Sequence, residues 1–236
     1  MDVGIVAPRN YLGLCHTRLH LAYATYLKHG AYLDFYRRKV STGTVILDTS
    51  PVLPRKLGSS LLLEGIRLLK PTYVVLPSID YSWDATLQAA RDFRKHRKLP
   101  PFIGVLQGYN LDTLERCYRG LKSLCGVIAL PSPLETIARR DEIIRDLGIK
   151  ESILYIEVYS DPYEEIPPKG SLGICTSLPI RLAQDYRRLE EFVPTPPPLD
   201  CELPLVSPFK ELARSNVEDY LEVVKEGSAY WRMQHD

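Results

Sequence analysis

Long hydrophobic runs, an excess charge of one sign and thermolabile amides are all scarce in this sequence. No apolar run among its 236 residues approaches the roughly 20 residues needed to span a bilayer, so we expect no transmembrane helix. The 30 Lys and Arg residues balance 29 Asp and Glu residues. This near-neutral net charge gives no indication that the chain as a whole binds nucleic acid or a membrane surface. Asparagine and glutamine occur only 3 and 4 times beside 19 prolines, a bias that weakly favours a thermophilic source.

Metal-binding and disulfide patterns are also missing. The 5 cysteines are an odd number and include no C-x2-C pair, which indicates neither a structural zinc site nor a disulfide framework. His16 and His20 are four residues apart, yet no third ligand accompanies them. We therefore predict no metal and no cofactor. We expect reduced thiols in a soluble, unexported protein of the cytoplasm, which is the host cytoplasm if the protein is viral.

Apolar runs of strand length recur along the chain. They lie at residues 3–7, 44–47, 73–76, 102–106, 126–130, 153–158, 171–174 and, more faintly, 203–206. Most of the intervals between them contain a helical pattern, as at 61–69 and 134–144. Strands that alternate with helices and are apolar on both faces indicate a parallel sheet. Repeated eight times, this pattern predicts an α/β fold, a (β/α)8 TIM-type barrel, as a single domain over residues 1–236.

Proline interrupts the pattern late in the chain. The interval 161–170 is short and proline-rich, and a second proline-rich stretch at 194–198 precedes the last predicted strand. We therefore expect the barrel to be incomplete or distorted at its last two units. Ser207 and Pro208 are typical of a helix N-terminus, which predicts a closing helix to about Lys225 and a C-terminal tail over 226–236.

Polar residues at the C-terminal ends of the predicted strands are the candidates for chemistry, because a TIM barrel places its active site on that face. Asp48 ends an apolar strand and could serve as a base or hydrogen-bond acceptor, although a turn or a helix cap is the ordinary alternative. Gln107 offers donors and an acceptor to the edge of a planar heterocycle, and Gly108 would permit its close approach. A simple loop amide is the alternative for Gln107.

Cys175 follows the seventh predicted strand, where a thiol that faces the start of a helix can act as a nucleophile. Chemistry alone favours the alternative, a small buried apolar role. Tyr81 and Trp83, in the loop after the third predicted strand, could stack on a base or cover the end of the core. Asp84 in the same loop is well placed to cap the next helix.

Two basic runs, at 37–39 and 94–98, fall at the C-terminal ends of predicted helices. That position puts them on the face opposite the candidate site, where they complement the helix dipole, and we interpret them as structural. A smaller basic set lies on the face of the candidate site and is sufficient for a few phosphate contacts. Its members are Arg9, Arg55, Lys56, Lys169 and Arg181.

Several strand-end segments occur in the order of a known family. They are Ile46-Leu47-Asp48, Val74-Val75-Leu76-Pro77, Gly104-Val105-Leu106-Gln107-Gly108, and Gly173-Ile174 followed by Leu178-Pro179-Ile180-Arg181. With these segments the chain resembles the tRNA-guanine transglycosylase superfamily over roughly residues 16–185. It is most similar to the short virus-type members, which insert 7-deazaguanines into DNA.

The resemblance implies a pentosyltransferase with a TIM-barrel fold that exchanges guanine for a 7-deazaguanine. In that family a strand-end aspartate attacks the sugar C1′, a second carboxylate handles protons, and a Gln-Gly element holds the heterocycle. By position, Gln107 and Gly108 match the base-holding element and Asp48 matches an acid. Ser78, Tyr109 and Arg181 are the further substrate-binding candidates. The zinc-binding cysteines of the tRNA enzymes are absent, which favours DNA over tRNA as the substrate.

The chain departs from the family at two carboxylates. Cys175 stands where the nucleophilic aspartate is expected, and Ser78 stands where short members have an aspartate after Leu-Pro. Asp80 is the candidate replacement for the second carboxylate, and a Cys175 thiolate is the candidate replacement for the nucleophile.

Three hypotheses remain open. The first is base exchange with Asp48, Asp80 and Cys175 as catalytic residues, acting on guanine or a 7-deazaguanine with DNA or RNA as the partner. The second is a catalytically inactive relative that binds a nucleobase, a nucleic acid or a partner protein. The third is an unrelated barrel enzyme, such as a glycoside hydrolase with Asp48 and Glu157 as paired carboxylates. In each case we expect no membrane partner, and a homodimer is compatible with all three.

Overall fold

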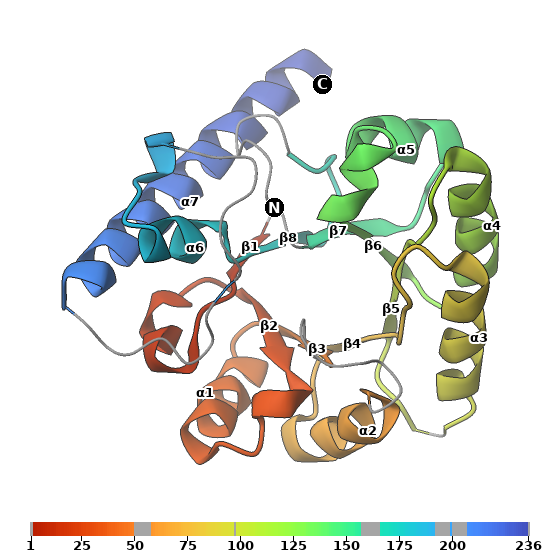
Figure 1. The fold of residues 1–236 in the computed structure, drawn as a ribbon, viewed down its shortest axis with the longest axis horizontal. Helices are drawn as coiled ribbons and strands as arrows, with labels where there is room; N and C mark the ends of the chain where they lie inside the picture. The colour runs from red at the N-terminus through yellow and green to blue at the C-terminus, as the bar shows by residue number, and fades with distance from the viewer. Residues whose placement is uncertain are drawn as a thin grey trace.

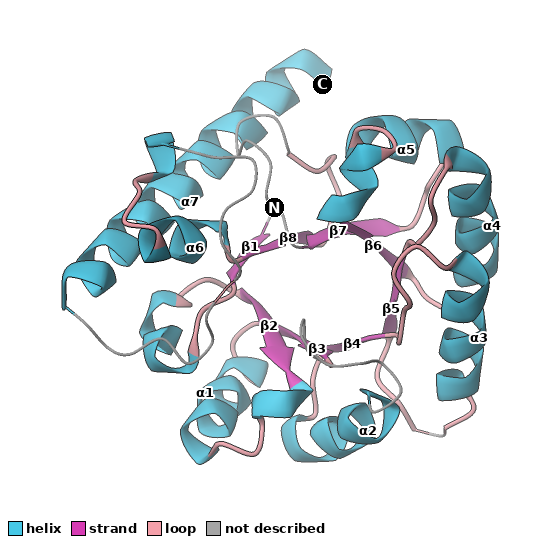
Figure 2. Cartoon of the chain, viewed as in Figure 1, coloured by secondary structure: helices cyan, strands magenta, loops and turns pink. Residues whose placement is uncertain are grey.

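A computed structural model describes residues 2–49, 58–96, 98–156, 166–191, 199 and 207–235 of the chain. In this part, eight parallel strands form one nearly closed barrel with helices around its outside (Figures 1 and 2). The strands are β1 (Asp2–Ile5), β2 (Leu19–Tyr23), β3 (Thr44–Asp48), β4 (Tyr73–Val75), β5 (Phe102–Val105), β6 (Val127–Pro131), β7 (Ser152–Ile156) and β8 (Gly173–Thr176). This arrangement confirms the predicted TIM-type barrel.

Most strands are followed by a helix that packs against the outside of the barrel. The α-helices are α1 (Gly30–Val40), α2 (Gly58–Leu69), α3 (Trp83–Arg94), α4 (Leu111–Leu121), α5 (Arg140–Leu147), α6 (Leu178–Gln184) and α7 (Ser207–His235). Short 3-10 helices are η1 (Arg9–Leu14), η2 (Ala24–Tyr26), η4 (Ser132–Thr136) and η5 (Leu189–Glu191). Among the residues whose placement is described, no helix is both long and apolar enough to cross a membrane.

Side chains of both strand faces are buried, which explains the nearly continuous apolar runs. One cluster fills the interior of the barrel, and a larger one lies between the strands and the helices. The interior cluster consists of Val6, Leu19, Leu21, Tyr23, Ile46, Val75, Ile103, Val105, Val127, Ala129, Leu154, Ile156 and Cys175. The barrel is therefore a packed core rather than a channel over most of its height.

In the part of the chain that the structure describes, the first unit of the barrel is irregular. β1 and β2 are the two ends of the sheet order, so the barrel has an unsealed seam between them. Their connection contains η1 instead of an α-helix. β2 was not among the predicted strands. The predicted distortion concerned the last two units, and the last predicted strand, at 203–206, lies outside the described residues.

Backbone alternation shows which groups face this seam. Val6 N donates to Thr176 O over 2.8 Å, so the even-numbered residues of β1 bond to β8. Thr44 N donates to Arg18 O over 2.8 Å, so the even-numbered residues of β2 bond to β3. Because consecutive residues of a strand direct their backbone groups to opposite edges, the odd-numbered residues of β1 and β2 face each other across the seam.

Side chains from α1 and from the β1–β2 connection bond these seam-facing groups. The hydrogen bonds run from Cys15 Sγ to Ile5 O (3.0 Å), from Tyr36 Oη to Leu21 O (3.1 Å) and from Tyr23 N to Tyr32 Oη (2.9 Å). All of these residues are buried, and a buried backbone group without a partner would cost free energy. These side chains therefore form hydrogen bonds with backbone groups of β1 and β2 that, in a fully closed barrel, would bond to each other.

Two predicted helices differ from the structure. The pattern over 134–144 is divided into η4 and α5, because Arg139 is extended and forms the N-cap of α5, with Glu142 Oε2 accepting from its backbone N–H. The closing helix α7 starts at Ser207 as predicted but continues to His235, through most of the predicted tail.

Arg37 and Arg94, one from each basic run, have the structural positions predicted for them. Arg37 lies in the last turn of α1 and donates through Nε to Leu68 O over 3.1 Å. Arg94 lies in the last turn of α3 and donates through a guanidinium nitrogen to Ser123 O over 2.7 Å. Each guanidinium thus bonds a carbonyl near the end of a neighbouring helix, where the helix dipole favours positive charge.

Candidate functional site

The C-terminal ends of the strands form one face of the barrel, and Asp48 lies on it at the end of β3. Ile46 belongs to the interior cluster, so the alternation of side chains along the strand directs Asp48 to the inner side as well. One of its carboxylate oxygens, Oδ1, accepts from Thr49 N over 2.6 Å and from Thr49 Oγ1 over 3.2 Å. The half-buried carboxylate is therefore fixed at the mouth of the barrel.

Cys175 lies deeper, inside the barrel. Its side chain belongs to the interior cluster and has no exposed area. Burial, and secondarily the charge of Asp48, raises the pKa of the Cys175 thiol far above its ordinary value. A nucleophilic cysteine requires a lowered pKa and access to substrate, so this environment favours the apolar role over the predicted catalytic one.

Gln107 lies after β5 and holds the loop that follows β4. Its side chain is 6% exposed, and its Oε1 accepts a hydrogen bond from Tyr81 N over 3.1 Å. Tyr81 has a φ of 57°, a left-handed conformation that is uncommon for a residue with a side chain. The Gln107 carbonyl thus stabilises an otherwise unfavourable loop conformation, and its amide nitrogen is the part that remains for a ligand.

Gly108 is required by packing within the protein. A Cβ at this position would lie 2.8 Å from Thr113 Oγ1 and 2.9 Å from Leu114 N, at the start of α4. The absence of a side chain at Gly108 therefore allows α4 to start close to the end of β5. The role that the sequence suggested for Gly108, close approach of a substrate, stays a prediction.

The loop after β4 carries the other predicted candidates. Ser78 is buried, with 9% of its surface exposed, whereas Asp80 is exposed. Asp84 lies in the first turn of α3, where the Ser82 hydroxyl donates to its Oδ1 over 2.7 Å and lowers the pKa of its carboxyl group. Asp84 therefore carries a negative charge at neutral pH, next to the exposed Tyr81.

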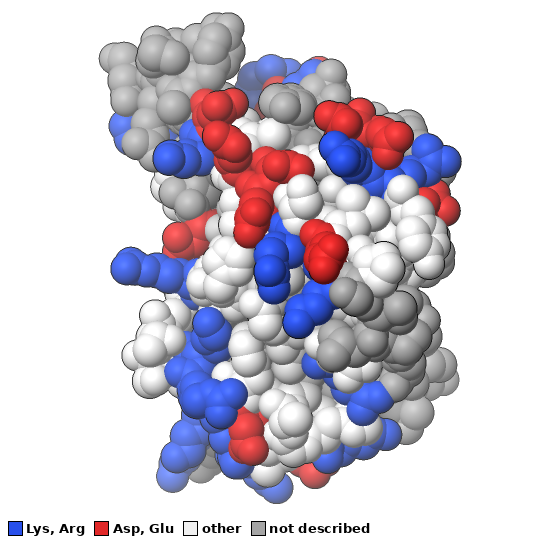
Figure 3. Space-filling view, turned by 90° about the vertical axis from the view of Figure 1, so that its left-hand side faces the viewer, with Lys and Arg blue, Asp and Glu red and all other residues white. Residues whose placement is uncertain are grey.

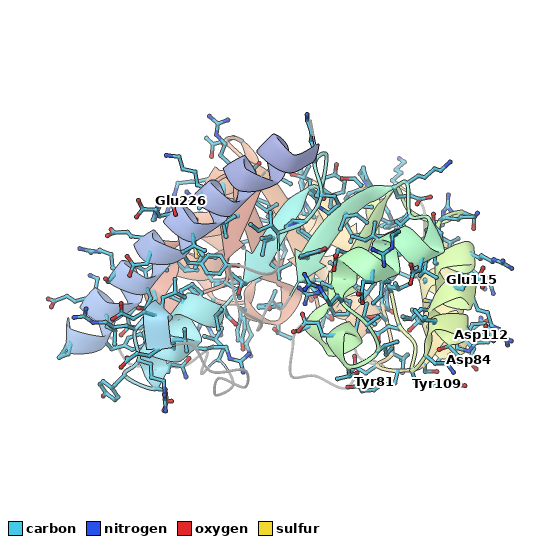
Figure 4. All side chains as sticks on the ribbon, turned by 90° about the horizontal axis from the view of Figure 1, so that it is seen from above. Tyr81, Asp84, Tyr109, Asp112, Glu115 and Glu226 are labelled. Atoms are coloured by element: carbon cyan, nitrogen blue, oxygen red, sulfur yellow. The ribbon has the colours of Figure 1, made fainter. Side chains whose placement is uncertain are left out.

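An open groove of about 680 Å³ lies on this face, between the loops that follow β4, β5 and β6. We call it the tyrosine groove. It is lined by Tyr81, Tyr109, Asn110, Leu111, Asp112, Thr136 and Ile137. Figure 4 shows Tyr81 and Tyr109 at the same edge of the molecule, with Asp84 and Asp112 close to them. Tyr109 was a predicted substrate-binding residue, but Asn110 and Asp112 were not singled out by the sequence analysis.

Arg181 is buried within α6, with 8% of its surface exposed, so it is less available to a polymer than the sequence suggested. Glu157, Arg55 and Lys56 lie outside the described residues. Within the described ranges, the histidine, cysteine and acidic side chains form no group that could hold a metal ion.

Comparison with known proteins identifies the fold class. No family model matches the sequence, and no curated protein matches it. Among solved structures, the BexX/CysO complex of Amycolatopsis orientalis has a TM-score of 0.54 and 12% identity, covering 96% of this chain and 91% of that one. Dihydrodipicolinate synthase of Aquifex aeolicus has a TM-score of 0.51 and 14% identity, covering 99% and 80%. The YdjI aldolase of Escherichia coli K12 has a TM-score of 0.50 and 10% identity, covering 95% and 88%.

These similarities show a TIM-barrel fold. Any reaction has to be inferred from the residues at the C-terminal face of the barrel. The same barrel supports many unrelated reactions, so the fold alone does not assign one.

Proposed function

We propose that the chain is an enzyme that exchanges guanine for a 7-deazaguanine in nucleic acid, with DNA favoured over tRNA. The observation that carries the proposal is the position of Asp48, a carboxylate on the inner side of the barrel mouth where TIM-barrel enzymes place reactive groups. The buried amide of Gln107 at the same face, and the motif order over residues 16–185, support a planar heterocycle as substrate.

The proposed reaction uses Asp48 as the nucleophile, because Cys175 is buried with a raised thiol pKa. A carboxylate oxygen of Asp48 attacks the sugar C1′, and the bond from C1′ to guanine N9 breaks with its electron pair on the base. Asp80 supplies the proton to the departing guanine and takes one from N9 of the incoming 7-deazaguanine. The incoming base then attacks C1′ and releases the Asp48 carboxylate.

Incorporation of radiolabelled guanine or a 7-deazaguanine into DNA tests this proposal. We expect Asp48→Asn to lose about a hundredfold or more in rate, since the amide cannot form the glycosyl ester. Asp92→Asn is the matched control, because Asp92 is an exposed carboxylate in the last turns of α3. No incorporation by the wild type, or an unchanged rate in Asp48→Asn, would contradict the proposal.

A non-catalytic relative that binds a nucleobase is the second candidate. It is favoured by one observation, the inaccessible Cys175 thiol at the position of the family's nucleophile. Calorimetric titration with guanine distinguishes the two candidates. Binding without incorporation, unaffected by Cys175→Ser and by Asp48→Asn, would favour the binding module. A homodimer stays a prediction for either candidate and is tested by sedimentation.

A further inference from the structure

The two tyrosines of the tyrosine groove are held by backbone hydrogen bonds to buried side chains. Tyr81 N donates to Gln107 Oε1 over 3.1 Å, and Tyr109 N donates to Thr113 Oγ1 over 3.0 Å. Thr113 belongs to the capping box of α4, in which Asn110 Oδ1 accepts from Thr113 N over 2.9 Å. Both loops are therefore ordered before any ligand binds, which lowers the entropic cost of binding.

The rings themselves face solvent. Tyr81 is 54% exposed and Tyr109 is 64% exposed, and Leu111 of the same groove is 42% exposed. Rings that are this exposed add little to the core, whereas rigid exposed aromatic side chains at the edge of a groove are typical of binding surfaces. The volume of about 680 Å³ is within the usual range for ligand sites and is sufficient for a short segment of extended polypeptide.

The charge of the groove selects the kind of ligand. Among the described residues that line it, Asp112 is the charged one, and neither lysine nor arginine lines it. Asp84, in the first turn of α3, lies close to Tyr81 and Asp112 in Figure 4 and is exposed. A nucleic-acid backbone would be repelled by these carboxylates, whereas a cationic side chain would be attracted by them and by the faces of the tyrosine rings.

At the border of the groove, an arginine of the protein itself, Arg116, already lies between an aromatic ring and a carboxylate. The guanidinium of Arg116 lies 5.8 Å from the centre of the Trp83 ring, and one of its nitrogens is 3.7 Å from Asp112 Oδ2. Arginine suits such a position better than lysine because its planar group can stack on a ring and pair with a carboxylate at the same time.

From these observations we infer that the tyrosine groove is a docking site for a partner polypeptide that presents arginine side chains. An arginine of the partner stacks between Tyr81 and Tyr109 and pairs with Asp112, and the remainder of its segment lies along Leu111 and Ile137. The residues of this docking site, Tyr81, Tyr109 and Asp112, have no role in the proposed reaction of Asp48 and Asp80, so either proposal can fail without the other.

Fluorescence anisotropy with a labelled nonapeptide of alternating arginine and glycine tests the inference. We expect saturable binding below about 1 mM, and loss of about tenfold or more in affinity in the double variant Tyr81→Ala/Tyr109→Ala. The double variant Tyr81→Phe/Tyr109→Phe should retain binding, because phenylalanine keeps the aromatic faces. Asp112→Asn should weaken binding severalfold, and the same peptide with citrulline in place of arginine should bind more weakly than the arginine peptide.

Two control variants separate this groove from the rest of the surface. On the side of the molecule that carries α6 and α7, a group of acidic side chains gathers in the upper part of the view, so a cationic peptide could also be attracted there (Figure 3). Glu226→Gln removes an exposed carboxylate of α7, distant from the tyrosine groove in Figure 4, and Tyr186→Ala removes a tyrosine that is 78% exposed. Neither variant should change the affinity.

Three results would overturn the inference. One is no binding of the arginine peptide at about 1 mM. Another is equal affinity of the wild type and the Tyr81→Ala/Tyr109→Ala variant. The third is tighter, tyrosine-dependent binding of a single-stranded oligonucleotide or of the matched glutamate peptide, which would assign the groove to a different partner.

Discussion

His20 couples the stability of the protein to pH. It lies on β2 with 1% of its surface exposed, between the rings of Phe35 and Tyr36, each 6.2 Å away. Burial, and secondarily the charge of Lys39, lowers the pKa of His20 from 6.5 to about 4. Below the ordinary pKa the unfolded chain therefore binds a proton that the folded protein does not, and stability falls as the pH falls from about 6.5 to about 4.

We predict that His20→Leu removes this component of the pH dependence. The shift corresponds to about 3 kcal/mol, so the free energy of unfolding of the wild type should fall by up to that amount relative to the variant between about pH 7.5 and about pH 4. Urea unfolding at a series of pH values measures the difference. His16→Gln, at an exposed position, should keep the wild-type profile. Parallel profiles for wild type and His20→Leu would contradict the assignment.

Strand-end residues could be predicted from the sequence, but their orientations could not. The alternation of strands and helices places Asp48, Gln107 and Cys175 on the same end of the barrel. Both faces of these strands are apolar, so the sequence pattern does not distinguish the interior from the helix-covered side. The bond between Gln107 and Tyr81 N depends on a left-handed φ at Tyr81, which no turn signal in that loop indicates.

At the scale of elements, α1 closes the seam of the barrel with tyrosine hydroxyls. We predict that Tyr36→Phe and Tyr32→Phe each lower the free energy of unfolding by about 1 to 3 kcal/mol, because they leave Leu21 O and Tyr23 N buried without these partners. Chemical denaturation measures the loss. Tyr186→Phe, which changes an exposed hydroxyl, should alter stability by less than about 0.5 kcal/mol. Losses no larger than that of the control would show that other groups seal the seam.

The same seam explains why β2 escapes sequence-based prediction. Leu19 to Tyr23 include a histidine, His20, which interrupts the apolar run, and β2 follows β1 without an intervening α-helix. The strand is stabilised by its ladder to β3, which lies beyond α1 in the sequence, and by side chains of α1 itself. Tertiary contacts of this kind determine whether a segment forms a strand when its local propensity for strand is weak.

At the scale of the whole molecule, the alternation of strands and helices is sufficient to predict the barrel, but its closure depends on individual contacts. The last helix, α7, packs on α6 and reaches back to η1, where the rings of Tyr11 and Phe209 are 4.7 Å apart. The C-terminal part of the described chain is thereby joined to the N-terminal part next to the seam. A helix-forming pattern after Ser207 predicts α7, whereas these contacts are set by the closed shape of the barrel.

Asn216 is the polar residue that fixes α7 in this position. It has no exposed area, its Oδ1 accepts from Leu189 N over 3.1 Å, and its Nδ2 donates to Pro179 O over 3.2 Å and to Arg187 O over 2.9 Å. Because one amide satisfies three backbone groups at the junction of α6, η5 and α7, its loss should weaken the closure of the barrel as a whole.

We predict that Asn216→Ala lowers the free energy of unfolding by about 3 kcal/mol, since these backbone groups lose their buried partner. Asn110→Ala removes the N-cap of α4 and should cost only about 1 kcal/mol. Urea unfolding compares the two variants, and hydrogen exchange should show faster opening of α6 and α7 in Asn216→Ala. Equal losses in the two variants, with unchanged exchange in α7, would mean that apolar packing alone holds the last helix against the barrel.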